Sequence, residues 1–200
     1  MDYNYTVLFL TNNDNTLSLI CWLKERCNVI EMRDKITLEF VRELDPDLVI
    51  SFNYKYIVKK DIISWLGKKI INMHISYLPW NKGSNPNFWS FFEDTPKGVT
   101  IHQLEEGLDT GKIIFQKEIF MNANEENFIS SYDKLLKGII ELFQEKWDVI
   151  RELSWEPVPQ NGTGSYHTMK DMENVQKVCE FSWSDNIAEY LNRYKEKIKE

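Results

Sequence analysis

The sequence predicts an α/β fold, built on an open and mainly parallel sheet with flanking helices. The main observation is that short apolar runs of strand type alternate with helical patterns of about 8–12 residues, which is typical of parallel βαβ units. The composition agrees with a globular protein, since 42% of the residues are hydrophobic and 14% are aromatic. A chain of 200 residues suffices for one domain with a small appendage.

The first half of the chain contains alternating strands and helices. The expected strands cover residues 5–10, 28–32, 48–52 and 69–73, each a short β-branched or aromatic run. The expected helices cover residues 16–25, 37–44 and 61–66. Asn13, Asp14 and Asn15 are plausible caps for the first helix, Pro46 stops the second and Gly67 ends the third.

The second half continues the alternation with longer elements. After a loop over residues 82–86, we expect a short aromatic helix over residues 87–93. Strands follow over residues 99–104 and 113–120, with a turn over 107–111 between them. Residues 124–151 contain a long amphipathic helix, because apolar side chains recur there at helical spacing. This order of elements predicts a Rossmann-like architecture.

A change in composition marks the end of the main domain. Prolines and glycines gather at Pro157, Pro159, Gly162 and Gly164. We therefore expect a main domain over residues 1–155 and a C-terminal appendage over residues 156–200. The appendage is too small for a core of its own, so it should pack on the main domain or, in a homodimer, on a second subunit.

Charge, hydropathy and cysteine content exclude several classes of function. The net charge of −7 argues against nucleic acid as a partner. No apolar run approaches the roughly 20 residues of a membrane helix, and no signal peptide is evident, so a cytoplasmic protein is expected. The three cysteines show no zinc-like pairing, so we expect reduced thiols and no metal.

Three side chains could carry out acid–base chemistry together. The chain has only three histidines, and of these His74 follows an expected strand and precedes a proline-bearing loop. Asn72 lies two residues earlier, so both would share one face of the strand. An amide can donate to an oxyanion, an imidazole can take a proton, and a carboxylate such as Asp109 can orient that imidazole. Taken singly, each also has an ordinary role: a turn residue, a hydrogen-bonded histidine and a turn cap.

Two stretches carry a resemblance to a known family. Residues 71–83, INMHISYLPWNKG, and residues 98–116, GVTIHQLEEGLDTGKIIFQ, resemble the signatures of N10-formyltetrahydrofolate-dependent formyltransferases. The similarity covers about the first 120 residues. It implies that Asn72, His74 and Asp109 form the catalytic triad and that N10-formyltetrahydrofolate is the formyl donor. The residues that it implies for the folate pterin are Phe52, Asn53, Tyr54, Glu106, Gly107 and Leu108.

Within that family, the tryptophan-rich loop and the later GTGSYHTMKDM, residues 162–172, look most like sugar N-formyltransferases. The implied acceptor is a 3- or 4-amino dideoxy sugar linked to a nucleotide, with dTDP favoured, and the implied pathway is synthesis of a surface polysaccharide such as the O-antigen of lipopolysaccharide. Lys82 is the expected contact for the pyrophosphate, although a lysine in a loop also commonly serves only as a solvated side chain. Trp80 and Trp89 could flank the sugar or base, together with Asn85, although large aromatic residues also serve as packing.

Other functions fit parts of the same pattern. The triad could activate water, which would make the protein a formyltetrahydrofolate hydrolase. A phosphoribosylglycinamide-type formyltransferase is weakened because the loop over residues 11–15 has no glycine to hold a phosphate. A catalytically silent nucleotide-sugar-binding module would have no physical need for all three triad residues.

Overall fold

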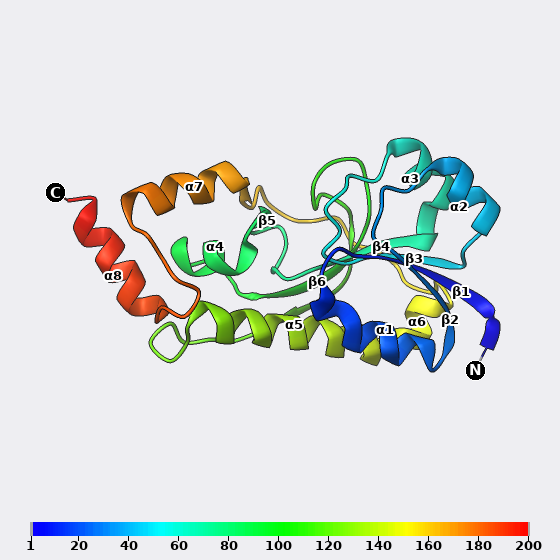
Figure 1. Cartoon of the computed structure of the whole chain (residues 1–200), viewed down its shortest axis with the longest axis horizontal. Helices are drawn as coiled ribbons and strands as arrows, with labels where there is room; N and C mark the ends of the chain where they lie inside the picture. The colour runs from blue at the N-terminus through cyan, green and yellow to red at the C-terminus, as the bar shows by residue number, and fades with distance from the viewer. Residues whose placement is uncertain (1, 200) are drawn as a thin grey trace. The chain divides into compact units, whose positions relative to one another are not determined.

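A six-stranded sheet organises the fold of the computed structural model, which describes residues 2–199. Its strands follow the order β2-β1-β3-β4-β6-β7 (Figure 1). They are β1 (Asp2–Leu10), β2 (Cys27–Met32), β3 (Leu48–Ser51), β4 (Ile70–His74), β6 (Gly98–Gln103) and β7 (Ile113–Glu118). A second sheet pairs two short strands, β5 (Lys82–Gly83) and β8 (Tyr166–His167).

The first four strands are parallel, which confirms the predicted fold class. Leu10 is the register partner of Ser51 on β3, and Ser51 is in turn the partner of Asn72 on β4. Strand β1 lies between β2 and β3, so the chain switches direction across the sheet between the ends of β1 and β3. In open α/β sheets, ligands bind outside the carboxyl ends of strands at such a switch point.

The chain groups into two compact units, each assembled from separate segments. The first unit holds the residues up to His74, Ile101–Ile114 and Phe143–Pro159. The second holds Ile75–Thr100, Phe115–Leu142 and the residues from Gln160 on. The C-terminal segment therefore does not form a unit by itself, and the boundary after residue 155 stays a prediction.

Helices cover both faces of the sheet in the first unit (Figure 1). Helices α2 (Leu38–Leu44) and α3 (Lys60–Leu66) lie on one face, and α1 (Leu17–Lys24) and α6 (Trp147–Arg151) lie on the other. Because side chains alternate along a strand, Leu8 and Leu10 of β1 pack with Val41 and Ile62 beneath α2 and α3. Short 3-10 helices flank α1 and α3, at Asp14–Thr16 and Gly67–Lys69.

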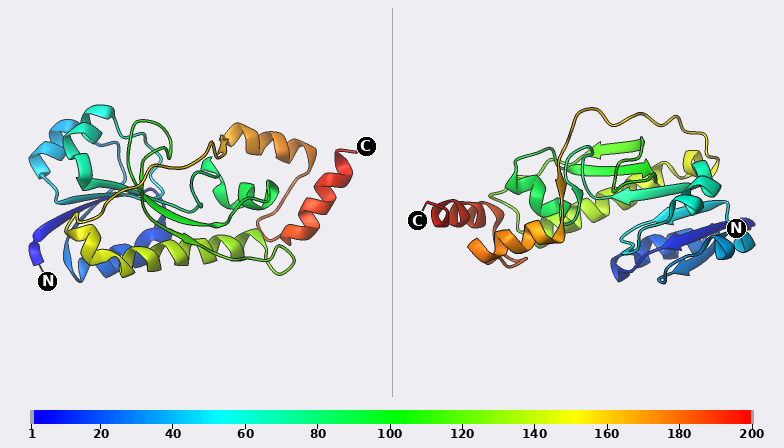
Figure 2. Two further views of the ribbon diagram at one scale, coloured as in Figure 1. Left: turned by 180° about the vertical axis from the view of Figure 1, so that it is seen from behind. Right: turned by 90° about the horizontal axis from the view of Figure 1, so that it is seen from above.

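The second unit has a core of its own, to which the C-terminal segment contributes. Its helices are α4 (Pro86–Phe92), the shared α5 (Phe128–Glu145), α7 (Met169–Val178) and α8 (Ile187–Lys197); α7 and α8 are orange and red in Figure 2. Phe88 and Phe128 are fully buried together with Tyr190. One expectation is corrected here: residues 82–86 are not loop throughout, because Lys82 and Gly83 form β5. Their partner β8 lies 84 positions further along the chain (166 − 82 = 84), so local pattern could not reveal the strand.

Glu126 is a buried carboxylate that should make this unit sensitive to pH. Its side chain is 4% exposed, accepts a 2.5 Å hydrogen bond from the Ser130 hydroxyl and pairs with Lys134. Burial raises the pKa of Glu126, but Lys134 and Ser130 together outweigh burial and hold the pKa below its ordinary value. Such a group stabilises the fold above the ordinary carboxyl pKa, and its contribution is lost as the pH falls through the lower, folded pKa.

We expect Glu126→Gln to lower the free energy of unfolding by about 1 kcal/mol at pH 7, since charge-assisted hydrogen bonds become neutral ones. Thermal denaturation would show a fall in Tm of about 3 °C that shrinks when wild type and variant are compared at about pH 4. Glu141→Gln is the matched control, because Glu141 is 49% exposed and pairs with Lys137 at 3.7 Å, so its Tm should hardly change. A Tm difference for Glu126→Gln that is equal at both pH values would contradict this account.

Candidate functional site

The structure brings Asn72, His74 and Asp109 together at the carboxyl end of β4. The Asn72 Nδ2 atom donates to Asp109 Oδ1 at 3.3 Å, and His74 Nε2 lies 3.8 Å from Asp109 Oδ2. The His74 and Asp109 side chains are 10% and 9% exposed. A separation of 3.8 Å is too long for a hydrogen bond but allows an ion pair once the imidazole is protonated. The structure therefore gathers an amide donor, an imidazole and a carboxylate in a largely buried setting.

His102 is a fourth member of this group. Its Nδ1 atom lies 2.8 Å from the carbonyl oxygen of Gln103, so we assign the ring proton to Nδ1. Its Nε2 atom can then accept from Asn72 Nδ2, which lies 3.1 Å away, and Nε2 is also 3.5 Å from Asp109 Oδ1. The ring thereby fixes which way the Asn72 amide points: one N–H is directed at His102 and the other at Asp109.

Backbone geometry places Asp109 in this group. Asp109 has φ of 53° and Gly107 has φ of 113°, a value that only glycine adopts easily. Gly111 allows a close approach to the end of β6: a Cβ atom there would lie 1.7 Å from the carbonyl oxygen of Gln103 and 3.3 Å from His102 Nδ1. The Gln103 N–H in turn donates to the Lys112 carbonyl at 2.9 Å. The turn over residues 107–111 therefore lies tightly against the strand that carries His102.

The place of His102 in this group is not predicted by the sequence, although all three histidines are candidates. His74 is the preferred candidate because it ends an expected strand, whereas His102 lies inside the expected strand 99–104. The available signal was the position of His102 near the carboxyl end of that strand, seven residues before Asp109 (109 − 102 = 7).

We expect His102→Leu to lower kcat/KM for the formyl transfer that the sequence predicts at least about tenfold. The reason is that one Asn72 N–H would lose its acceptor, so the amide could rotate. His102→Gln should recover part of the loss, since a glutamine amide oxygen can accept in the place of Nε2. Steady-state kinetics with both variants, alongside Tm, tests this. Equal activity of wild type and His102→Leu would show that the reaction does not depend on His102.

The turn expected to hold the folate pterin follows β3, beside the strand that carries Asn72. Phe52 is fully buried, and its N–H donates to the Leu10 carbonyl at 3.0 Å. Asn53 has φ of 54°; its Nδ2 atom donates to Asn15 Oδ1 at 3.1 Å, and its carbonyl accepts from the Asn12 N–H at 3.0 Å. The loops after β1 and β3 are thus joined at the switch point of the sheet.

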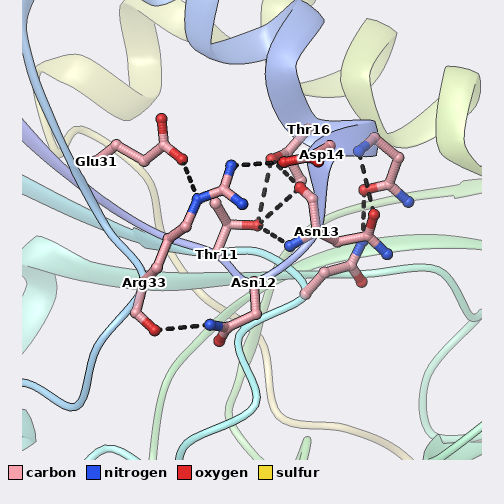
Figure 3. Close-up of polar contacts among 9 residues, drawn as sticks. Thr11, Asn12, Asn13, Asp14, Thr16, Glu31 and Arg33 are labelled. Atoms are coloured by element: carbon pink, nitrogen blue, oxygen red, sulfur yellow. Dashed lines mark hydrogen bonds and ion pairs between the residues drawn. The ribbon is translucent and has the colours of Figure 1, made fainter.

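The first loop is held by its own side chains (Figure 3). The Asn13 N–H donates to the Thr11 hydroxyl oxygen at 3.2 Å, and the Thr16 hydroxyl donates to the Asn13 carbonyl at 2.8 Å. Asn12 Nδ2 donates to the Arg33 carbonyl at 2.7 Å. The Arg33 guanidinium forms ion pairs with Asp14 and Glu31, both at 2.7 Å. Hydroxyl and amide groups therefore fix this loop, in which glycine is absent.

The other residues expected near the folate lie in two environments. The Tyr54 hydroxyl donates to the Asp34 carbonyl at 2.6 Å and accepts from the Ile36 N–H at 3.3 Å, and burial raises the pKa of Tyr54. Glu106 is exposed and forms an ion pair with Lys60 at 2.7 Å, while Leu108 is 47% exposed. Tyr54 thus has a structural hydrogen-bonding role, and Leu108 presents apolar surface in the loop that carries Asp109.

The four residues expected to contact the acceptor all lie in the second unit. Trp80 is 37% exposed, and Lys82 is half-buried on β5. Asn85, with φ of 53°, donates from Nδ2 to the Met169 sulfur at 3.6 Å. Trp89 is 4% exposed and stacks on His167, with ring centroids 3.9 Å apart and an interplanar angle of 8°. Trp80, Lys82 and Asn85 are accessible, whereas Trp89 lies beneath a histidine.

Two classes of site are absent from the described residues. Within residues 2–199, no group of three or more His, Cys, Asp or Glu side chains is arranged to hold a metal ion. Over the same range, none of the helices combines the length and the apolarity that crossing a bilayer requires.

Known formyltransferases are similar in sequence to this chain. The family model described as formyl transferase matches residues 13–138. A methionyl-tRNA formyltransferase of Thermodesulfovibrio yellowstonii is 34% identical over 167 residues, and a dTDP-4-amino-4,6-dideoxyglucose formyltransferase of Mycobacterium bovis is 29% identical over 168 residues. These matches cover 83% and 84% of this chain, and 53% and 68% of the two relatives. The chain therefore spans only about half the length of the first relative.

A solved structure is similar over nearly its whole length. The formyltransferase PseJ from Anoxybacillus kamchatkensis was crystallised in complex with UDP-4,6-dideoxy-4-formamido-L-AltNAc and tetrahydrofolate. It is 36% identical to this chain with a TM-score of 0.84, and the match covers 94% of this chain and 99% of that one.

Proposed function

Because this chain belongs to the formyl transferase family, we propose that it transfers a formyl group from N10-formyltetrahydrofolate to the amine of a nucleotide-linked amino dideoxy sugar. The observation that carries this proposal is the convergence of Asn72, His74 and Asp109 in one largely buried group. An amide donor, an imidazole and a carboxylate are what amide formation from an amine requires.

In the proposed reaction, the sugar nitrogen attacks the formyl carbon. His74 takes a proton from the attacking amine and returns it to the folate nitrogen as the bond between that nitrogen and the formyl carbon breaks. Asn72 redirects the N–H that donates to Asp109 toward the oxygen on which negative charge develops, while its second N–H stays on His102. Asp109 stabilises the protonated form of His74, for which their 3.8 Å separation is suitable.

We assign the folate pterin to the turn Phe52, Asn53, Tyr54 and to the loop Glu106, Gly107, Leu108. The register pair Ser51 and Asn72 supports this assignment, because the turn that follows Ser51 then lies beside β4, the strand that carries Asn72 and His74. The exposed Leu108 side chain offers apolar surface to a flat ring. For the acceptor we assign Trp80, Lys82 and Asn85 as direct contacts. Trp89 is assigned an indirect role, because it is buried and supports the ring of His167 by stacking.

We further propose that the acceptor amine is at C4 of the sugar. The ligand named in the PseJ structure carries a 4-formamido group, and the sugar in the name of the Mycobacterium bovis relative carries a 4-amino group. The nucleotide differs between them, UDP in the first and dTDP in the second, so the earlier expectation of dTDP stays a prediction. An enzyme of this kind would act in the cytoplasm, as a homodimer, in the synthesis of a surface polysaccharide such as an O-antigen.

A panel of acceptors tests this function. Purified protein would be incubated with N10-formyltetrahydrofolate and with UDP- and dTDP-linked 4-amino and 3-amino dideoxy sugars, and mass spectrometry would follow conversion of the free amine into a formamide. We expect at least one 4-amino sugar nucleotide to be converted. If no sugar nucleotide of either kind were converted, the proposed function would be wrong. Conversion of only 3-amino sugars would overturn the assignment of C4.

Two further arms separate other reactions of the same triad. Initiator methionyl-tRNA is included because of the 34% identical relative, although the net charge of −7 disfavours a polyanionic acceptor. A reaction without acceptor measures formate release. Formylation of the tRNA alone, or formate release that acceptors do not suppress, would replace transfer to a sugar as the function.

A further inference from the structure

The segment Gly164–Met169 lies along residues 79–85 through a continuous series of contacts within the second unit. Gly164 approaches Pro79 so closely that a Cβ atom there would lie 1.9 Å from the Pro79 carbonyl oxygen. The Ser165 hydroxyl donates to Asn81 Oδ1 at 3.1 Å and accepts from the Asn81 N–H at 2.9 Å. The Lys82 N–H then donates to the Ser165 carbonyl at 3.0 Å. The C-terminal segment is therefore part of the same surface as the loop that carries Trp80 and Lys82.

Strands β5 and β8 give this surface two different faces. They pair in parallel, with Lys82 opposite Tyr166 and Gly83 opposite His167. Register partners project to the same face of a sheet, and neighbours along a strand project to opposite faces. His167 is 9% exposed, stacks on Trp89 and lies 3.1 Å from Glu93 Oε1. The outward face therefore carries Lys82 and Tyr166.

Tyr166 is unusual because its ring is exposed at a rigidly built position. The residue is 54% exposed, although the strand beneath it is fixed by the stacked His167 and by hydrogen bonds at both ends. Gly83 leaves room for the Tyr166 ring, since a Cβ atom at Gly83 would lie 3.1 Å from Tyr166 Cε2 and 2.3 Å from the His167 carbonyl oxygen. A supported aromatic ring next to a lysine has the chemistry to bind a flat base joined to a diphosphate.

We propose that the outward face of β5 and β8 binds the nucleoside diphosphate part of the acceptor, with the base stacked on the Tyr166 ring and the diphosphate paired with Lys82. This inference rests on the proposed function, in which a nucleotide carries the sugar, and it adds the C-terminal segment to the acceptor site. Stacking is tolerant of base identity, because every base has a π-face. Tyr166 therefore supplies affinity for the base without selecting uracil over thymine.

Calorimetric titration of the full chain with UDP, dTDP and inorganic pyrophosphate, in the absence of folate, tests the proposal. We expect Tyr166→Ala to weaken UDP and dTDP about ten- to hundredfold and by equal factors, as for loss of one stacked base. Pyrophosphate affinity should be unchanged in that variant. Lys82→Ala should weaken all three ligands, and Tyr166→Phe should bind like wild type because the ring is retained.

Controls separate a lost ring from a disturbed fold. Phe120→Ala removes an aromatic side chain that is 87% exposed in the same unit, and it should leave every affinity unchanged. Tyr166→Leu keeps the bulk of the side chain but not the π-face, so it should behave like Tyr166→Ala even if the smaller variant were unstable. Wild-type affinity for UDP in Tyr166→Leu would overturn the role of Tyr166.

The outcomes also separate this proposal from the proposed reaction. Ring-dependent binding of UDP or dTDP without formyl transfer to any amino sugar would support the nucleotide site and defeat the reaction. Formyl transfer by a protein whose nucleotide affinity does not change in the Tyr166 variants would support the reaction and defeat the nucleotide site. A wild-type protein that binds neither UDP nor dTDP would overturn the nucleotide site.

Discussion

His74→Asn should lower kcat for formyl transfer by about 100-fold or more, the usual size of the loss when a general acid–base group is removed. Asparagine is close in size and polar, so it fills the space at the end of β4, but it cannot take a proton from the acceptor amine. Its amide would still face Asp109, which now lies 3.8 Å from His74 Nε2. The loss should therefore fall on the chemical step and leave KM for both substrates within a small factor.

Steady-state kinetics with saturating N10-formyltetrahydrofolate measures this change, and thermal denaturation confirms that the variant folds. His102→Gln is an informative companion, since it changes the neighbouring ring without removing the proposed base. If His74→Asn turned over as fast as wild type, His74 would not be the base. A variant that lost folate binding instead of turnover would place His74 among the residues that hold the donor.

Gly111→Ala is expected to damage both stability and activity. The added methyl group would lie 1.7 Å from the Gln103 carbonyl oxygen, so either the end of β6 or the turn over residues 107–111 must move. Overpacking against backbone costs about 3 kcal/mol, which corresponds to a fall in Tm of about 9 °C for a chain of this size. Since Asp109 belongs to the same turn, a shift of about 1 Å in its carboxylate should lower kcat roughly 100-fold.

Gly67→Ala is the matched control for this experiment. Gly67 also lies in the first unit, at φ of 56°, but an added Cβ atom would meet nothing within 4 Å. At φ of 56° and ψ of −120° the backbone lies outside the left-handed helical region, and alanine there costs about 1–3 kcal/mol, so Tm should fall by a few degrees while kcat stays unchanged. Comparison of the two variants separates the effect of a lower stability from displacement of Asp109. A Gly111→Ala protein with the Tm and kcat of wild type would show that the turn can yield without moving the carboxylate.

Most of the fold could be predicted from the sequence because its elements are local and well delimited. Strand β3 is buried along its whole length, as expected of a short apolar run in a parallel sheet. Helix α2 begins after Thr37, whose side chain accepts from the Phe40 N–H, and its C-cap Asp45 directly precedes Pro46. Each boundary thus has a cause within a few residues of itself, which is the range that sequence patterns report.

The site was predictable in part for the same reason. Asn72 and His74 share a face of one strand, and the loop to Asp109 is rich in glycine, so short motifs carry that arrangement. His102 was missed because its role depends on the Nε2 contact to Asn72, 30 positions earlier (102 − 72 = 30). The pairing of Ser165 and Tyr166 with Asn81 and Lys82 could not be predicted because these partners lie 84 positions earlier (165 − 81 = 84). No local pattern encodes contacts of that separation.

Each of the two units is assembled from separate segments of the chain, and this determines the order in which they can fold during synthesis on the ribosome. The last stretch of the first unit ends at Pro159, so its core can close while the remaining residues are still being made. The second unit needs Ile187 and Tyr190 to cover Phe88, so that aromatic surface stays open until α8 has been made. The nascent chain is therefore exposed to aggregation around the apolar face of α4 in the interval between the synthesis of α4 and that of α8.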